Sequence, residues 1–186
     1  TMANTLCWLG HGAWQLTTST GKVFLVDPWL NGNPVAAVKL EELPQADYVL
    51  VTHDHFDHAS DVPAVVRQTG ATFVAQPETT ARYIEAGVPK DKALAGGSGM
   101  NIGGSVVLSG ATVTMTDALH TSETGEPAGY ILELEDGKVI YFAGDTAISS
   151  NMTLWGQLFD IDVAVLPVGG HFTMDGRQAA HALRLL

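Results

Sequence analysis

The sequence has few of the features that mark secreted, membrane-spanning or nucleic-acid-binding proteins. Its single cysteine, Cys7, excludes an intrachain disulfide, and its first ten residues lack the basic start and apolar run of a signal peptide. Only nine Lys and Arg accompany 20 Asp and Glu, and the resulting net charge of −11 repels phosphate backbones and anionic lipids. No stretch approaches the roughly 18 consecutive apolar residues that span a bilayer. We therefore expect a cytoplasmic protein that binds neither nucleic acid nor a membrane.

The remaining composition is that of a compact domain. The chain has 186 residues, of which 46% are hydrophobic and 16% charged. A chain of this length buries roughly 70% of the surface that it exposes when unfolded, which is enough for one sizeable core. We therefore expect a single domain over residues 1–186.

Short β-branched and aromatic runs, separated by Gly, Pro, Ser and Asn, predict two sets of strands. In the first half we expect strands over residues 6–10, 13–17, 22–26, 48–51 and 71–75, with helices over 61–69 and 77–87. Ser60 is expected to cap the first helix. In the second half we expect strands over residues 105–109, 111–116, 130–134, 138–142 and 163–166, with helices over 152–159 and 178–186. The pattern predicts an α+β sandwich in which two sheets pack face to face with helices outside.

Three His and one Asp are concentrated in six residues, His53-x-His55-x-Asp57-His58, directly after an apolar strand. In an extended loop the side chains of His53 and His55 point to the same side, whereas Asp57 and His58 can turn toward a second centre. One short loop could therefore supply ligands to two metal ions.

Two further candidates also follow predicted strands, where a rigid sheet ends and a side chain is free to bind. His120 follows the run Thr114 to Leu119, and Asp145 follows a strand through the turn Ala143-Gly144. A carboxylate freed by such a turn can bridge two cations. These positions extend the predicted metal site beyond the 53–58 loop.

These residues resemble the metallo-β-lactamase superfamily through Thr-His-Asp-His-Phe-Asp-His at 52–58, His120 and Phe-Ala-Gly-Asp-Thr at 142–146. Within it, the chain looks most like bacterial metal-dependent hydrolases related to ascorbate-phosphate lactonases. The motifs that carry this second resemblance are Leu9-Gly10-His11, Asp27-Pro28-Trp29-Leu30, Gly144-Asp145-Thr146-Ala147, Leu166-Pro167-Val168-Gly169-Gly170 and Phe172-Thr173-Met174. They cover nearly the whole chain.

The resemblance implies a ligand set and a fold. It implies that the first metal is held by His53, His55 and His120, the second by Asp57 and His58, and that Asp145 bridges the two. It also implies the four-layer αββα sandwich of the metallo-β-lactamase fold. Members of that family usually continue past the last helix into a strand that ends in a His of the second metal site, whereas this sequence apparently lacks that strand. Either further residues carry it, or His171 takes the place of its His, or only the first site binds metal firmly. A sheet that lacks this strand has an unpaired edge, which would favour a homo-oligomer.

The ligand types predict a hydrolase in which a metal-bound hydroxide cleaves an ester, lactone or phosphoester bond of a small molecule. Asp57 is expected to orient the water and is therefore the catalytic residue. Asp27 is expected to support the metal loop or a ligand imidazole by hydrogen bonds. His11 could be a core histidine or lie at the rim of the active site, and His171 could approach the substrate. Trp8, Trp14 and Trp155 are interpreted as packing residues.

Two alternative functions share these ligands. A phosphodiesterase or nuclease would need a basic path for the nucleic acid, which a net charge of −11 does not favour. A metal-binding protein without turnover would use the same residues as a closed structural site. We expect one or two divalent ions, for which three His favour zinc, while manganese, iron, nickel or cobalt also bind His and carboxylate ligands.

Overall fold

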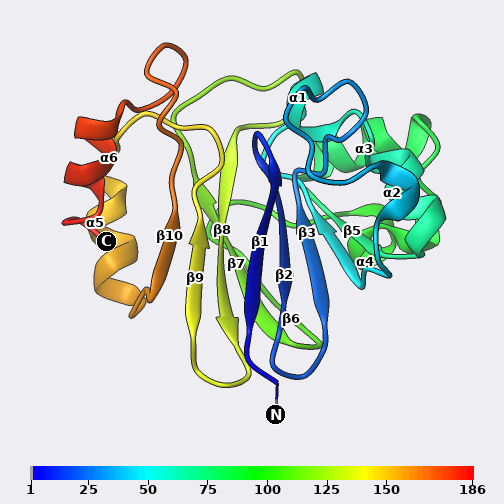
Figure 1. Cartoon of the computed structure of the whole chain (residues 1–186), viewed down its shortest axis with the longest axis horizontal. Coiled ribbons are helices and arrows are strands. Elements are labelled where there is room, and N and C mark those ends of the chain that lie inside the picture. Colours follow the sequence, from blue (N-terminus) through cyan, green and yellow to red (C-terminus); the bar gives the residue numbers. More distant parts are fainter. Residues whose placement is uncertain (1) are drawn as a thin grey trace. The chain divides into compact units, whose positions relative to one another are not determined.

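The structure is a computed structural model that describes residues 2–186. Two compact units make up the chain. The first runs to Asn101 and also includes Ser122–Gly125, and the second comprises Ile102–Thr121 and Glu126–Leu186. Each unit contains one five-stranded sheet (Figure 1). The two expected sets of strands are therefore present.

The sheet of the first unit has the order β1-β2-β3-β4-β5. Its strands are β1 (Thr5–Gly10), β2 (Ala13–Thr17), β3 (Val23–Val26), β4 (Tyr48–Leu50) and β5 (Thr72–Val74). Strands β1 to β3 pair antiparallel, as the meander predicted, and β4 and β5 then add in parallel. Its helical segments are η1 (Leu40–Glu42), α1 (Phe56–Ala59), α2 (Val62–Thr69), α3 (Pro77–Glu85), η2 (Lys90–Lys92) and α4 (Leu94–Gly97).

The core of this unit holds the central strands rigid. Val49 and Phe73 are fully buried and belong to one hydrophobic cluster with Val62, Val65 and Val66 of α2. Tyr83 of α3 joins the same cluster and contacts the Phe73 ring at a centroid distance of 5.7 Å. Helices α2 and α3 therefore pack on this sheet, and the loop after β4 starts from a fixed position.

Ser60 does not cap α2, contrary to the sequence-based expectation. A short helix, α1, contains Asp57 and His58 of the metal-ligand motif and precedes α2, and Ser60 ends it by donating its backbone N–H to Phe56 O. The residue before α2 is Asp61, whose carboxylate accepts the backbone N–H groups of Leu30 and Asn31, both at 2.7 Å. Asp61 therefore ties the loop after β3 to the start of α2.

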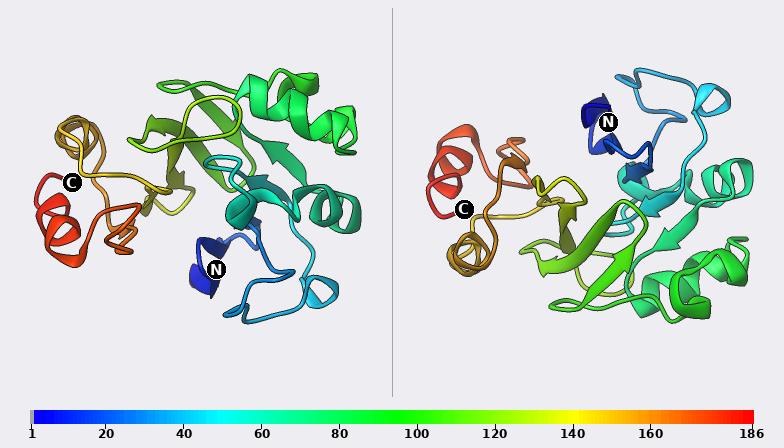
Figure 2. Two further views of the ribbon diagram at one scale, coloured as in Figure 1. Left: turned by 90° about the horizontal axis from the view of Figure 1, so that it is seen from above. Right: turned by 90° about the horizontal axis from the view of Figure 1, so that it is seen from below.

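The sheet of the second unit has the order β10-β9-β8-β7-β6. Its strands are β6 (Ser105–Leu108), β7 (Ala111–Asp117), β8 (Ala128–Leu134), β9 (Val139–Phe142) and β10 (Val163–Val165), and its helices are α5 (Asn151–Leu158) and α6 (Gly176–Ala182). Strands β6 to β9 pair antiparallel, and β10 adds to β9 in parallel. Helices α5 and α6 lie together beside β10 (Figure 2), where Met152, Met174 and Ala182 form a buried cluster.

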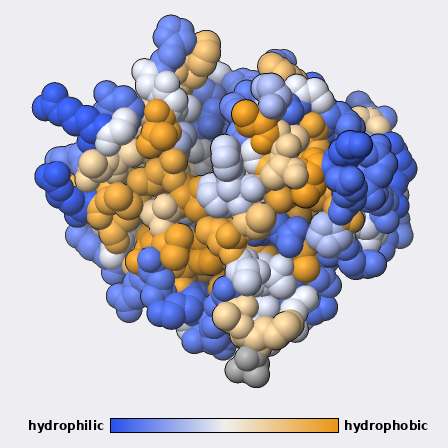
Figure 3. All heavy atoms as spheres, viewed as in Figure 1, coloured by the Kyte–Doolittle hydropathy of each residue, from blue (hydrophilic) through white to orange (hydrophobic). Residues whose placement is uncertain are grey.

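Strand β10 is the edge of this sheet, and part of its surroundings is apolar and exposed. Apolar side chains gather over α5, β9 and β10 (Figure 3), and Leu158 and Val163 are among the exposed ones. Of the residues described, none forms a helix long and apolar enough to cross a membrane. Trp8, interpreted from sequence as a packing residue, lies on β1, an edge strand of its sheet, and is 52% exposed.

Candidate metal centre

The His-rich loop begins where the buried strand β4 ends. His53 is buried, and its Nε2 lies 3.0 Å from Nδ1 of His55. The other nitrogen of the His53 ring, Nδ1, lies 3.0 Å from the Thr52 hydroxyl. The two imidazoles therefore converge through facing nitrogens, as the alternation of side chains in an extended loop predicts.

Asp27 connects this loop to β3. Its Oδ1 accepts the backbone N–H of Thr52 at 2.8 Å, and its Oδ2 accepts the Thr52 hydroxyl at 2.6 Å. The same Oδ2 lies 2.8 Å from Nδ1 of His58. Asp27 has φ +46°, a left-handed conformation that is uncommon for residues other than glycine and that Asp tolerates better than most. The buried carboxylate thus positions both ends of the metal-ligand motif.

A second group forms where the turn between β1 and β2 meets α1. Nε2 of His11 lies 3.1 Å from Oδ2 of Asp57, and the His11 ring contacts the His58 ring edge-on at a centroid distance of 5.3 Å. Gly12 is required in this turn, because a Cβ there would lie 2.6 Å from Cε1 of His58. The sequence-predicted residues His11, Asp57 and His58 therefore lie together within the first unit.

The donors of the first unit fit a divalent metal ion. One ligand atom from each of His11, Asp57 and His58 lies within 4.8 Å of the other two, and the same holds for Asp27, His53 and His58. Imidazole nitrogens and carboxylate oxygens are the ligands that zinc, manganese and iron share. Groups of this kind at the end of a rigid strand can hold a metal ion that remains accessible on one side.

The second unit brings His120 and Asp145 together. Nε2 of His120 lies 3.6 Å from Oδ2 of Asp145. The segments that carry them are joined by two hydrogen bonds, from Leu119 N to the Thr146 hydroxyl at 2.9 Å and from Ala147 N to Leu119 O at 3.0 Å. Gly144 precedes Asp145 with φ +63°, a turn conformation that glycine adopts without steric cost.

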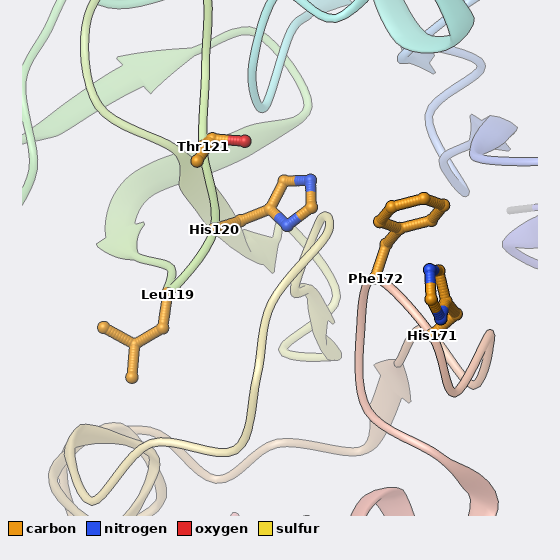
Figure 4. A pocket seen from close by; sticks show the side chains of 5 residues that line it. All are labelled: Leu119, His120, Thr121, His171 and Phe172. Atoms are coloured by element: carbon orange, nitrogen blue, oxygen red, sulfur yellow. The ribbon is translucent and has the colours of Figure 1, made fainter.

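An open pocket of about 540 Å³ adjoins His120 within the second unit. It is lined by Leu119, His120, Thr121, His171 and Phe172. His120 and Phe172 point toward each other across it, whereas Leu119 points away (Figure 4). His171, whose approach to substrate was a sequence-based expectation, packs edge-on against Phe172 with ring centroids 4.4 Å apart.

Asp54 has a role that the sequence reasoning missed. Its Oδ1 accepts the Ser122 hydroxyl and the backbone N–H groups of Glu123 and Thr124, and its Oδ2 accepts the Thr124 hydroxyl and pairs with Arg82. Residues 122–125 are held to the first unit in this way, although they lie about 70 positions further along the chain. The position of Asp54 between two predicted ligands was the only signal, and it does not identify such distant partners.

Burial opposes ionisation of Asp54, but the hydrogen bonds from Thr124, Ser122 and Arg82 outweigh it and lower the pKa of the carboxyl to about 2. The same contact raises the pKa of the Arg82 guanidinium. Asp54 is therefore a charged structural anchor at neutral pH, and its oxygens are committed to protein donors rather than to a metal ion.

Comparisons with known proteins identify the family of this chain. A family model described as a β-lactamase superfamily domain matches residues 22–186. The chain is 49% identical over 185 residues to a UPF0173 metal-dependent hydrolase of Nitratidesulfovibrio vulgaris, covering 100% of this chain and 77% of that protein. It is 42% identical over 182 residues to a metal-dependent hydrolase of Pyrobaculum islandicum, covering 96% of this chain and 78% of that one.

Solved structures also match this chain. Igni18, a metallo hydrolase from the archaeon Ignicoccus hospitalis, matches with a TM-score of 0.87 and 35% identity, covering 98% of this chain and 78% of that one. An isothiocyanate hydrolase from Delia radicum gut bacteria shares the fold, with a TM-score of 0.70, 22% identity, and coverage of 97% and 80%. The chain belongs to the β-lactamase superfamily domain family and is a metal-dependent hydrolase of the metallo-β-lactamase fold.

Proposed function

We propose that the protein cleaves an ester, lactone or phosphoester bond of a small molecule with one or two divalent metal ions, zinc being favoured. The residues proposed to hold these ions are His53, His55, Asp57, His58, His120 and Asp145. The observation that carries this proposal is that His58 has a ligand atom within 4.8 Å of one from Asp57 and of one from His53, while Nε2 of His53 lies 3.0 Å from Nδ1 of His55. His120 and Asp145 approach to 3.6 Å in the second unit and extend the same donor chemistry.

The residues of this chain have different roles at such a site. When bound, divalent ions lower the pKa of a coordinated water toward ~7 and polarise a carbonyl or phosphoryl oxygen. Asp27 fixes the orientation of the His58 ring through Nδ1, which presents the opposite nitrogen, Nε2, as the ligand. Asp57, which is only partly buried, offers a carboxylate that can orient a water molecule and accept its proton.

The proposed substrate is small because the charge and the pocket favour neither a nucleic acid nor a long polymer. A net charge of −11 opposes binding of a phosphate backbone. The pocket beside His120 offers the exposed ring of Phe172 and the imidazole of His171, which suit an apolar or planar group next to the cleaved bond. The charge and these side chains therefore favour a small ester or lactone over a phosphodiester strand.

The test compares metal-free and zinc-loaded protein on four probes: p-nitrophenyl acetate, dihydrocoumarin, p-nitrophenyl phosphate and bis(p-nitrophenyl) phosphate. The proposal predicts turnover of at least one probe by the loaded protein, lost on chelation and reduced more than about 100-fold in His55→Ala. His181→Ala, an exposed helical histidine, is the matched control and should behave like the parent. Equal rates with and without metal, or in His55→Ala and parent, would overturn the proposal.

A further inference from the structure

His11 lies in a turn whose geometry is unusual and strongly constrained. The turn joins β1 to β2 and places His11 at φ +53°, a conformation that is strained for a residue with a Cβ. The indole Nε1 of Trp8 donates to the backbone oxygen of His11 at 2.8 Å and holds this conformation. Backbone strain of this kind persists where the surrounding structure enforces it, and it clusters at active sites and ligand-binding sites.

The imidazole of His11 is held as firmly as its backbone. Its ring contacts Trp29 edge-on at a centroid distance of 5.3 Å and His58 at the same distance. Its Nε2 points at Asp57, 3.1 Å from Oδ2. The nitrogen is thus aimed at one residue proposed as a metal ligand while the ring touches another.

We propose that His11 is itself a ligand of the metal ion that Asp57 and His58 bind, which makes a His–Asp–His site from the β1–β2 turn and α1. This inference rests on the proposed function, because it assigns a further ligand to the same metal site. Its ligand atoms already lie within 4.8 Å of one another. Nitrogen and oxygen ligands of one tetrahedral zinc ion lie about 3.3 Å apart, so small side-chain shifts close the site.

The contact between His58 and Asp27 and the exposure of the three side chains support this site. Nδ1 of His58 is engaged by Asp27 at 2.8 Å, so Nε2 is the nitrogen that this ring offers to a metal. His58 is 2% exposed, Asp57 27% and His11 41%. The site is therefore closed on the His58 side and open on the His11 side, which leaves room for water or substrate, as catalytic metal sites require.

The contact between His11 and Asp57 could instead be a hydrogen bond that acts only through Asp57. The two roles have different effects on a bound ion. A ligand determines the electronic spectrum of the metal, whereas a hydrogen-bond partner of a ligand chiefly changes the binding affinity. Co²⁺ distinguishes them, because its visible absorption depends on the number and type of its ligands.

The experiment titrates metal-free protein with Co²⁺ and follows the visible absorption and, by calorimetry, the affinity and stoichiometry. The test variant is His11→Asn, because Asn tolerates positive φ and removes the imidazole without adding backbone strain. We expect the parent to bind two Co²⁺ ions and His11→Asn to lose more than roughly 100-fold in affinity for one of them, with a changed spectrum. His181→Ala should match the parent, and circular dichroism of each variant checks the fold.

Each other outcome overturns the inference in a recognisable way. An unchanged spectrum in His11→Asn, with or without weaker binding, shows that His11 is not a ligand and leaves the hydrolase proposal intact. If the parent binds one ion, and this ion is lost in His55→Ala but retained in His11→Asn, then His11 is again not a ligand and the hydrolase proposal still stands. A parent that binds no Co²⁺ overturns both proposals.

Discussion

Nδ1 of His58 lies 2.8 Å from Oδ2 of Asp27, and both side chains are 2% exposed, although 31 residues separate them in sequence. The same carboxylate also binds the backbone and hydroxyl of Thr52, directly before His53. One buried group therefore fixes both ends of the His-rich motif. Its substitution should affect metal binding more than folding.

Asp27→Asn should weaken metal binding about 10- to 100-fold, as is typical when a hydrogen-bond partner of a ligand is changed. Asn keeps the size and tolerates φ +46°, but it presents an NH₂ group where Oδ2 accepts from Thr52 and contacts His58. The proton of the His58 ring then moves from Nδ1 to Nε2, and Nε2 no longer has a lone pair with which to bind the metal ion. Calorimetric titration with Zn²⁺ measures the effect, with the exposed Asp160→Asn as control. An unchanged affinity would contradict this role for Asp27.

Gly12→Ala should displace His58 and reduce both stability and metal affinity. The added Cβ would lie 2.6 Å from Cε1 and 2.9 Å from Nδ1 of the His58 ring, which Asp27 already holds in place. Overpacking of this kind costs about 1–3 kcal/mol in the free energy of unfolding. Gly176→Ala is the control, because its Cβ would meet nothing within 4 Å. Urea unfolding of both variants checks the difference, and equal midpoints would count against the observed packing.

Asp54→Ala should release residues 122–125 from the first unit. The variant removes every hydrogen bond that Ser122, Glu123 and Thr124 make to this carboxylate and leaves Arg82 without its ion-pair partner. Because the Arg82 side chain is 43% exposed, water can solvate it after the substitution, and the larger cost comes from the donors of residues 122–124 that lose the buried carboxylate, about 1–3 kcal/mol for each that stays buried. Hydrogen exchange of the Glu123 and Thr124 amides should become much faster.

Asp47→Ala is the matched control for Asp54→Ala, because Asp47 also accepts a backbone N–H, from Val23, and pairs with a cation, Lys22. It should leave exchange at Glu123 unchanged. Protection of the Glu123 amide that survives in Asp54→Ala would show that other contacts hold this segment.

Tyr141 should make stability fall at alkaline pH. Burial raises the pKa of its phenol to about 12, whereas an unfolded tyrosine ionises near 10. Because the folded pKa is the higher one, this contribution is complete below pH 10 and is lost as the pH rises through about 12. Absorbance at 295 nm should show that Tyr141→Phe removes a group titrating near 12, and its stability should fall less between pH 10 and 12. Loss of a group titrating near 10 instead would refute the burial argument.

Much of the fold follows from local sequence patterns. The meander of β1 to β3 was predictable because short apolar runs alternate with turn residues, and the helices over 61–69 and 77–87 were predictable from apolar period and flanking Pro or Gly. The capping of α2 was not, because the helical turn α1 that occupies Ser60 has no apolar periodicity of its own. The exposure of Trp8 was missed because the pattern of a strand does not reveal which of its faces other elements cover.

The candidate site also contains both residues that the sequence identifies and residues that it does not. His53, His55, Asp57 and His58 are recognisable because ligand residues at close spacing after an apolar strand are rare in chance sequences. Asp54 and its partners are not, because its donors lie 68 to 70 positions away and no local pattern encodes such a contact. His11 lies between these cases, since the sequence placed it either in the core or at the active-site rim, and the 3.1 Å contact with Asp57 shows what it faces.

Zinc content per chain shows whether the 53–58 loop binds a divalent metal ion. Metal-free protein is loaded with Zn²⁺, freed of excess by gel filtration and analysed for zinc per chain, beside His55→Ala and the control His181→Ala. We expect one to two zinc ions per chain in the parent and the control, and at least one fewer in His55→Ala. No zinc above the buffer level in a folded parent, or equal zinc in His55→Ala and parent, would contradict it.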